Sequence, residues 1–242
     1  MSVEFGQIQL VPGYRKVAAA ISERILSREL REGARLPSET ELARQFGVNR
    51  STVREALREL ESGGLLERRP GSKLMTVSRP RHLAVAKDVS RALALHDVTF
   101  LEVWEALSQF EPPFAEIAAR NRSPEDLESL SSACERFTQE NAETEKAVHH
   151  AAEFFRAIGR ATHNQVLALV QEPLLHLLEP SLRVMIDKVP QARSRIVAAQ
   201  RRILDAIAKR DAEAARAWMT RHIRDFRKGY ELADIALDCR IA

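Results

Sequence analysis

Gly47-Val48-Asn49-Arg50-Ser51-Thr52-Val53-Arg54-Glu55-Ala56-Leu57-Arg58-Glu59-Leu60 is the stretch that decides the fold of the first third of the chain. Gly47 permits the left-handed backbone that ends a helix, and Asn49 is a residue type that caps the next one. Apolar residues then recur at three- and four-residue spacing: Val53, Ala56, Leu57 and Leu60. Arg50, Arg54 and Arg58 follow at four-residue steps on a different face. The stretch therefore predicts a turn and then a helix with one buried face and one basic face.

Further elements are predicted on both sides of this stretch. A helix from about 14 to 27 carries apolar residues at helical spacing. Ser38 and Glu41 have the spacing of a capping box, which would start a short second helix before the turn. Two short strands are expected around a proline-glycine turn, at 65–69 and 73–77. Three helices followed by a basic hairpin predict a winged helix-turn-helix.

The rest of the chain shows only helical patterns. The expected helices lie near 85–96, 99–121, 124–140, 143–162, 165–187, 191–209 and 212–236. Their lengths and short connections predict an antiparallel all-α bundle of six or seven helices. Ser78-Arg79-Pro80-Arg81 has the polar, proline-broken composition of a linker. We therefore expect a winged helix-turn-helix domain at 10–78, a linker at 79–84 and an all-helical domain at 85–236.

The composition of the 242 residues excludes several classes of protein. Apolar residues make up 45% and charged residues 29%, which argues against a disordered or collagen-like chain. The sequence lacks the roughly 18 uninterrupted apolar residues of a membrane helix and the N-terminal pattern of a secretory signal. Two cysteines are too few for a disulfide framework. We expect a cytoplasmic protein with no membrane partner.

Positive charge is concentrated in the first third of the chain. Residues 1–80 contain 14 lysines and arginines against 10 acidic residues, whereas residues 81–242 contain 23 against 24. A basic module on a neutral body suggests a polyanionic partner, most often a nucleic acid.

The basic helix has the side chains that reading DNA requires. An α-helix fits the major groove, where residues near its N-terminus reach base edges and phosphates. The side chains at that position are Arg50, Ser51, Thr52 and Arg54. Arg58, one turn further on, is better placed for a phosphate or for a partner on its own helix.

The hairpin supplies a second basic group. Its cations are Arg68, Arg69 and Lys73, which would lie against the phosphate backbone or in the minor groove. Gly71 lets the hairpin tip approach closely. The alternative is that the arginines of the helix form an ordinary solvated face paired with Glu55 and Glu59. The ordered succession of capped helix, glycine turn, second capped helix and basic hairpin favours DNA binding.

With these motifs the sequence resembles a known family. The segments that look like the DNA-binding domain of GntR-family transcription regulators are Leu36-Pro37-Ser38-Glu39, Leu42-Ala43, Gly47 through Leu57, and Leu60 through Leu65. The resemblance covers about residues 10–78. It implies that the DNA contacts are made by Arg50, Ser51, Thr52 and Arg54, with Gly71 at the wing tip. Thr40 departs from the family pattern, because many members have an arginine there.

The helical part resembles the ligand-binding domain of the FadR-like branch of that family, the FCD domain. The segments that carry this resemblance are Phe110-Glu111-Pro112, Ala115, Ile117 through Arg120, Phe154 through Ile158 to Asn164, Ile203 through Ile207, and Asp211 through Arg216 to His222. The resemblance implies homodimers on palindromic operators in double-stranded DNA. It also implies a small-molecule effector inside the bundle that alters DNA affinity.

Many members of this branch hold a divalent metal through one aspartate and three histidines, and the metal holds a carboxylate effector. The corresponding positions here carry Ala151, Phe155, Gln200 and His222, so only the last histidine is kept. Leu107 stands where an arginine is common. Because Zn²⁺ needs about three protein ligands or more, we expect neither a metal nor another cofactor. The effector, an organic acid or acyl compound, would then lie among these five positions. An apolar segment of it would touch the methyl and phenyl groups that replace metal ligands, and Gln200 and His222 would orient its polar group.

We expect a sequence-specific transcription regulator that is not an enzyme. The sequence contains no Gly-rich phosphate loop, no Gly-x-Ser-x-Gly elbow and no His-Glu-x-x-His motif. One alternative is that the pocket is closed and the helical domain only dimerises the protein. A second is a nucleoid-type protein that binds DNA without an effector. A third is a metal-dependent enzyme domain that uses His149, Glu153 and His222. His149 and His150 are also the residues that would replace missing metal ligands.

Overall fold

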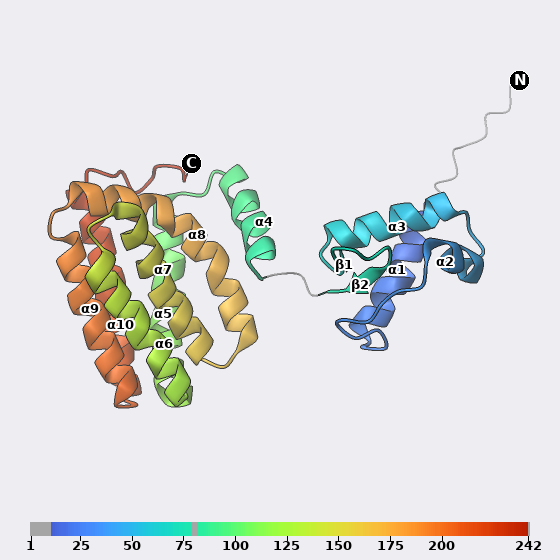
Figure 1. Cartoon of the computed structure of the whole chain (residues 1–242). Helices are drawn as coiled ribbons and strands as arrows, with labels where there is room; N and C mark the ends of the chain where they lie inside the picture. Colours follow the sequence, from blue (N-terminus) through green and yellow to red (C-terminus); the bar gives the residue numbers. More distant parts are fainter. Residues whose placement is uncertain (1–10, 79–81, 242) are drawn as a thin grey trace, which may run out of the picture. The chain divides into compact units, whose positions relative to one another are not determined.

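The computed structural model describes residues 11–78 and 82–241. The chain divides into two compact units, Met1–Arg81 and His82–Ala242. Each unit has its own hydrophobic core. Figure 1 shows the helices and strands of both units, coloured along the sequence.

The N-terminal unit consists of three helices and a two-stranded sheet. Its elements are α1 (Gly13–Leu26), α2 (Glu39–Phe46), α3 (Arg50–Ser62), β1 (Leu66–Arg68) and β2 (Met75–Val77). α3 packs against α1, α2 and β1. Its buried residues are Val53, Ala56, Leu57 and Leu60, the predicted stripe. The predicted winged helix-turn-helix is confirmed, although each strand is shorter than expected.

Local chemistry explains the connection between α2 and α3. Gly47 ends α2 in the left-handed conformation, with φ of 63°, and the Ser38 hydroxyl accepts a hydrogen bond from the N–H of Glu41 at 3.3 Å. The reciprocal bond of a capping box is not made, because the Glu41 carboxylate accepts from two side chains in the next turn of α2. Asn49 occupies the N-cap position of α3 without a capping hydrogen bond. The two helix starts were therefore predicted correctly, but two of the expected side-chain bonds are absent.

The second strand of the hairpin is hydrogen-bonded to the loop between α1 and α2. β1 and β2 are antiparallel, with Leu66 opposite Val77 and Arg68 opposite Met75. Two backbone N–H groups of the loop before α2 donate to carbonyls of β2, both at 2.9 Å. Gly71 at the turn has φ of 77°, which favours glycine. The hairpin tip therefore projects from a base that is fixed by backbone hydrogen bonds.

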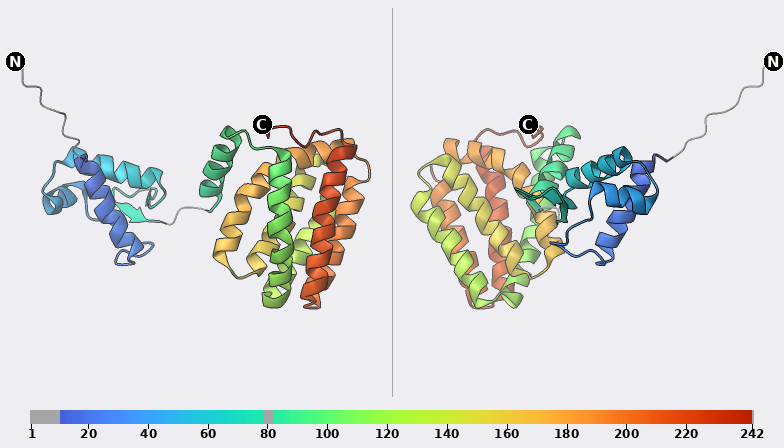
Figure 2. Two further views of the ribbon diagram at one scale, coloured as in Figure 1. Left: turned by 180° about the vertical axis from the view of Figure 1, so that it is seen from behind. Right: turned by 45° about the vertical axis from the view of Figure 1, so that its right-hand side comes forward.

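The C-terminal unit is an all-α bundle. Its helices within the described residues are α4 (His82–Leu95), α5 (Phe100–Asn121), α6 (Pro124–Glu140), α7 (Thr144–Ala161), α8 (Gln165–Lys188), α9 (Ala192–Ala208) and α10 (Ala212–Leu232). α4 packs along α8, and α10 packs mainly on α5 and α9. The back view in Figure 2 shows α5, in green, beside α10, in red. These seven helices confirm the predicted bundle.

The boundary between the units differs from the predicted linker at 79–84. Residues 79–81 lie outside the described residues, and 82–84 belong to α4. Pro80 is the last helix breaker in this region, and His82-Leu83-Ala84 contains neither proline nor glycine. A helix can therefore begin within two residues of this proline.

Side-chain caps fix several helix starts in the bundle. Thr99 and Glu102 form a capping box at α5, and Ser123 and Asp126 form one at α6, where Pro124 is the first helical residue. The predicted starts of these two helices, 99 and 124, lie within one residue of the observed ones. Within the described residues, the structure has no helix that is long and apolar enough to span a membrane.

A buried carboxyl group lies where α5, α7 and α8 meet. Glu111 is fully buried, and Nε2 of Gln171 donates to both of its oxygens at 3.0 Å. The same nitrogen donates to the Phe155 carbonyl at 3.1 Å. Gly159 makes room for this amide, because a Cβ there would collide with it. Burial raises the pKa of Glu111 to about 8, so the group is neutral at pH 7.

Replacing Glu111 by glutamine should change the pH dependence of stability. The folded-state pKa of about 8 lies above the reference value of 4.5, so Glu111 destabilises the folded chain increasingly as pH rises through this window. The free energy of unfolding of the Glu111→Gln variant, minus that of the wild type, should rise by about 1.4 kcal/mol per pH unit there. Urea titrations of the full chain, followed by fluorescence, measure this difference, because Trp104 and Trp218 both lie in the C-terminal unit.

The matched control is Glu105→Gln, a change at an exposed position of the same helix. This variant should follow the pH dependence of the wild type. If the Glu111→Gln variant also follows it, the buried carboxyl group is not neutral in the folded chain.

Candidate nucleic-acid interface and interior polar site

The first turn of α3 presents polar side chains to solvent. Arg50 and Ser51 are exposed, whereas Thr52 is half-buried. The methyl group of Thr52 lies 3.4 Å from where a Cβ at Gly13 would stand, at the start of α1. Thr52 therefore also helps to hold α3 against α1, while the two residues before it are accessible to a partner.

An acidic residue of α2 orients Arg54. Nε and Nη2 of Arg54 donate to Oε2 of Glu39 at 3.1 and 2.9 Å. The Arg54 side chain is 50% exposed and that of Glu39 is 25% exposed. The hydrogen bonds from Arg54 hold the pKa of Glu39 below its usual value. The pair fixes the guanidinium beside the start of α2 and leaves half of its surface accessible.

The ion pair with Glu39 did not follow from the sequence pattern. Within the described part of the chain, no ion pair joins the arginines of α3 to Glu55 or Glu59. Glu39 is fifteen residues from Arg54 and on another helix, so helical spacing does not connect them. The sequence feature that points to this pair is Glu39 itself, an acidic residue in the first turn of α2 that directly follows the capping residue Ser38.

The hairpin places further cations near α3. A hollow between α3 and the sheet is lined by Glu39, Arg54, Leu57, Arg58, Glu61, Arg68 and Met75. Arg58 is exposed, and so is Arg69, which pairs with Glu67 at 3.2 Å. Gly71 and Lys73 are exposed at the hairpin turn. The predicted basic residues thus form one group on α3 and a second on the hairpin, and Arg58 and Arg68 line the hollow between them.

The five residues expected around the effector are all in the interior of the C-terminal unit. Leu107, Ala151, Phe155, Gln200 and His222 are at most 2% exposed. The rings of Phe155 and His222 stack with centroids 5.6 Å apart and planes 8° apart. Phe226 packs on His222 at 4.6 Å. Phe155 stands where the family resemblance implies a metal-binding histidine. Its ring covers the imidazole of His222.

Two of these interior side chains have unsatisfied polar atoms. Both amide atoms of Gln200 and Nε2 of His222 are buried without a hydrogen-bond partner among the described residues. Burial lowers the pKa of His222 to about 4, so the imidazole is neutral at pH 7. A buried polar atom without a partner costs about 1–3 kcal/mol. The interior therefore contains an amide and a neutral imidazole that are able to bind a polar group.

The donor set does not fit the divalent metal that the family resemblance implies. Among the described residues there is no group of three or more histidine, cysteine, aspartate or glutamate side chains that could hold a metal ion. His149 is exposed and its ring packs on that of His150 at 5.3 Å. His163 contacts Asp126 at 2.6 Å. Glu153, proposed beside His149 in the enzyme alternative, pairs with Arg156 at 3.2 Å.

Two family models match the chain. Residues 13–74 match the model described as bacterial regulatory proteins, gntR family, and residues 102–225 match the FCD domain. The first match contains α1, α2, α3 and β1 and ends just before β2. The second spans most of α5 to α10.

Curated relatives and a solved structure are similar over most of the chain. The Uxu operon transcriptional regulator of Escherichia coli (strain K12) is 28% identical over 89% of this chain and 85% of its own length. The Glc operon transcriptional activator of the same strain is 28% identical over 92% and 89%. The Streptococcus agalactiae GntR structure has a TM-score of 0.65 and 26% identity, and the match covers 89% of this chain and 99% of that one.

The two basic groups should differ in their effect on DNA binding. Arg54→Ala should cost about 1–3 kcal/mol of discrimination between a specific duplex and its scrambled form, because a base contact is lost. Lys73→Ala should weaken binding to both duplexes alike. The slope of log affinity against log salt concentration should become shallower by about one, as expected for the loss of a phosphate contact. The specific duplex is selected from a random library by the full chain, and fluorescence anisotropy at two salt concentrations gives the affinities.

Glu55→Ala on the exposed part of α3 is the matched control and should leave discrimination unchanged. Wild-type discrimination in Arg54→Ala would show that this face of α3 does not read bases.

Proposed function

Because this chain belongs to the GntR family of bacterial regulatory proteins and carries an FCD domain, we propose that it is a homodimeric, effector-responsive transcription regulator. It binds a palindromic operator through α3 and the hairpin. Its C-terminal unit binds a small organic acid or acyl compound, and this binding changes the operator affinity. The observation that carries the effector proposal is the pair of buried side chains, Gln200 and His222, with unsatisfied polar atoms.

The DNA-binding part of the proposal relies on the accessible face of α3. Arg50 and Ser51 are exposed at its N-terminus, where a recognition helix contacts base edges. Arg54 is held by Glu39 with half of its side chain accessible, so little side-chain entropy remains to be lost on binding. Two such helices, related by a two-fold axis, match the two half-sites of a palindrome.

The effector part relies on the chemistry of the bundle interior. Gln200 offers an amide donor and acceptor, and His222 offers a neutral imidazole nitrogen. Phe155 and Phe226 supply apolar surface against that imidazole. A ligand with one polar end and one apolar segment would satisfy both kinds of surface.

The competing interpretation is a bundle that only dimerises the protein. The observation that favours it is the close packing of Phe155 on His222, because Phe155 then fills the position where the family resemblance implies a metal-binding histidine. A response of operator affinity to a metabolite separates the two interpretations, because a pure dimerisation unit has no ligand.

Effector binding should raise the melting temperature of the full chain and change its affinity for the selected duplex. A thermal-shift panel of organic acids, sugar acids and acyl-CoA thioesters identifies the ligand, since a compound that binds the native state stabilises it. Operator titrations with and without that compound should then differ by about 5- to 150-fold. The control is the N-terminal variant Lys73→Ala, which should keep the thermal shift. A panel without any shift, or a shift without a change in affinity, would favour the dimerisation unit.

The protein should carry no metal at the interior site. Elemental analysis of full chain purified without chelator, beside a denatured sample, should find zinc, nickel and manganese far below one per chain. Only one of the four ligand positions, His222, keeps a metal-binding side chain. Near-stoichiometric metal that disappears in His222→Ala would refute the assignment and would mean that His149, His150 or another side chain completes a site.

A further inference from the structure

Charge is unevenly distributed along the C-terminal unit. Residues 191–232, which contain α9 and α10, have 11 lysines and arginines against 5 acidic residues, whereas residues 82–190 have 10 against 17. α9 and α10 pack on each other, so the excess of positive charge lies on one pair of neighbouring helices (Figure 1). The near-neutral total of the unit is therefore the sum of a basic part and an acidic part.

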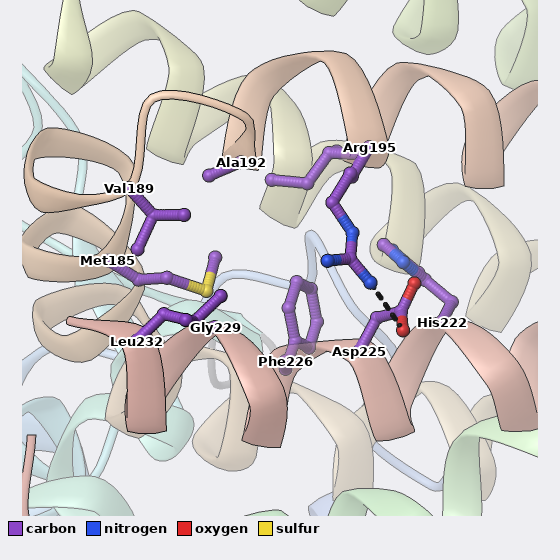
Figure 3. Close-up of a pocket in the computed structure, with 10 residues that line it drawn as sticks. Met185, Val189, Ala192, Arg195, His222, Asp225, Phe226, Gly229 and Leu232 are labelled. Atoms are coloured by element: carbon purple, nitrogen blue, oxygen red, sulfur yellow. Dashed lines mark ion pairs between the residues drawn. The ribbon is translucent and has the colours of Figure 1, made fainter.

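Two contacts between α9 and α10 fix which side chains share a face. Figure 3 shows Arg195 of α9 directed toward Asp225 of α10, and Nη2 of Arg195 lies 2.8 Å from Oδ1 of Asp225. The guanidinium of Arg202 lies 5.5 Å from the ring centroid of Trp218. Seven residues forward on α9 thus correspond to seven residues back on α10, as antiparallel helices require. Because seven residues are close to two turns, Arg195 and Arg202 lie on one face of α9.

α10 adds three cations to this face. Arg221, Arg224 and Lys228 are exposed and recur at three- and four-residue spacing. The guanidinium of Arg221 lies 4.8 Å from the Trp218 centroid, so arginines from two helices lie over the same ring. We call the following five residues the α9–α10 basic face: Arg195, Arg202, Arg221, Arg224 and Lys228.

Most of the positive charge on this face is not neutralised. Asp225 pairs with Arg195, but the other four cations of the face form no ion pair and no hydrogen bond with any residue that the structure describes. Exposed arginines elsewhere in the bundle, such as Arg160 and Arg183, pair with glutamates. A cluster of unpaired cations creates a positive potential that attracts a polyanion.

The composition of the face favours a nucleic acid over an acidic protein. Protein–protein interfaces have an apolar core, but the exposed small residues between the cations are Ala198 and Ala217. Leu232, at the end of α10, is the one large apolar side chain of these two helices that is exposed within the described part of the chain. Protein–DNA interfaces are more polar and much more positively charged. The face therefore has the composition of a DNA-contacting surface.

The tryptophan in the face orients arginines. Two guanidinium groups already lie over the Trp218 ring, so the ring is not a platform on which the bases of a single strand stack. A guanidinium that is held over an aromatic ring loses side-chain freedom, while its N–H groups stay available for a phosphate. This arrangement suits the phosphate backbone of a duplex.

We propose that the α9–α10 basic face is a second DNA-contacting surface, which binds backbone phosphates of double-stranded DNA without reading the sequence. Arg202 and Arg221, oriented by Trp218, each bind a phosphate, and Arg224 and Lys228 strengthen the attraction. Such contacts raise the affinity for any duplex and carry no sequence information. This inference goes beyond the proposed function, in which α3 and the hairpin contact the operator.

The double variant Arg202→Gln/Arg221→Gln removes the two oriented cations. The full chain is titrated with the selected duplex and with its scrambled form by fluorescence anisotropy at several salt concentrations. The slope of log affinity against log salt concentration should become shallower by about two for both duplexes. Both affinities at low salt should fall about tenfold or more. The ratio of the two affinities should stay at the wild-type value, because no base contact is lost.

The matched control is Arg136→Gln/Arg183→Gln, which removes the same charge from exposed positions of α6 and α8 and should keep the wild-type slope. The proposal is overturned if Arg202→Gln/Arg221→Gln keeps that slope, or if the control lowers it equally. If Arg202→Gln/Arg221→Gln keeps the slope while Arg54→Ala loses discrimination, the proposed function stands and the assignment of the basic face is wrong.

Poly-L-glutamate separates the two classes of polyanion. Our assignment expects Arg202→Gln/Arg221→Gln to weaken binding of the full chain to duplex DNA. If this variant instead weakens binding to poly-L-glutamate and leaves duplex binding unchanged, the face docks an acidic protein and the proposal is overturned.

A tethered cleavage reagent tests the position of the face on DNA. An iron chelate is attached to the full chain at Ala217→Cys, in a Cys239→Ser background, since Cys134 is buried. Ala217 is exposed and precedes Trp218, so hydroxyl radicals produced there should cut the backbone of the bound duplex. The same chelate at Gln139→Cys, an exposed position of α6, should cut far less. No cutting from position 217, or equal cutting from both positions, would overturn the proposal.

Discussion

Burial of the apolar face of α3 is the constraint on which the DNA-binding unit depends. Val53 and Ala56 are completely inaccessible, and Leu57 and Leu60 nearly so. Because side chains three and four residues apart share a helix face, burying this face fixes the opposite one outward. Arg50 and Ser51 are exposed for this reason, and Glu39 then adds a second restraint on Arg54. The basic side of the helix is held rigidly toward solvent because its other side is part of the core.

The interior of the C-terminal bundle, in contrast, contains buried polar side chains. Glu111 is neutral there, and the Gln171 amide joins it to the backbone of α7. Gln200 and His222 have no such protein partner within the described residues, and unsatisfied buried groups are costly. A helical unit that served packing alone would be more stable with apolar residues at both positions. Their presence in the interior fits the ligand-binding unit that we propose.

Local signals were enough to predict the fold but not the side-chain partners. Helical periodicity placed most helix ends within one or two residues, because this signal is contained in a few turns. The structure shows that caps such as Thr99 and Ser123 fix the starts of α5 and α6. Asn49 was predicted as a capping side chain, but the structure shows no such bond. The Arg54–Glu39 pair and the Glu111–Gln171 hydrogen bonds each join two different helices. Such pairs depend on tertiary packing, which spacing along the chain does not encode.

The central claim is that α3 reads base edges in the major groove as part of a two-fold dimer. Dimethyl sulfate protection of the selected duplex tests it, because this reagent methylates guanine N7 in the major groove and adenine N3 in the minor groove. The account predicts two groups of protected guanines about one helical turn apart, with protection lost in the Arg54→Ala variant. Protection confined to adenine N3, or guanine protection that persists unchanged in that variant, would contradict it.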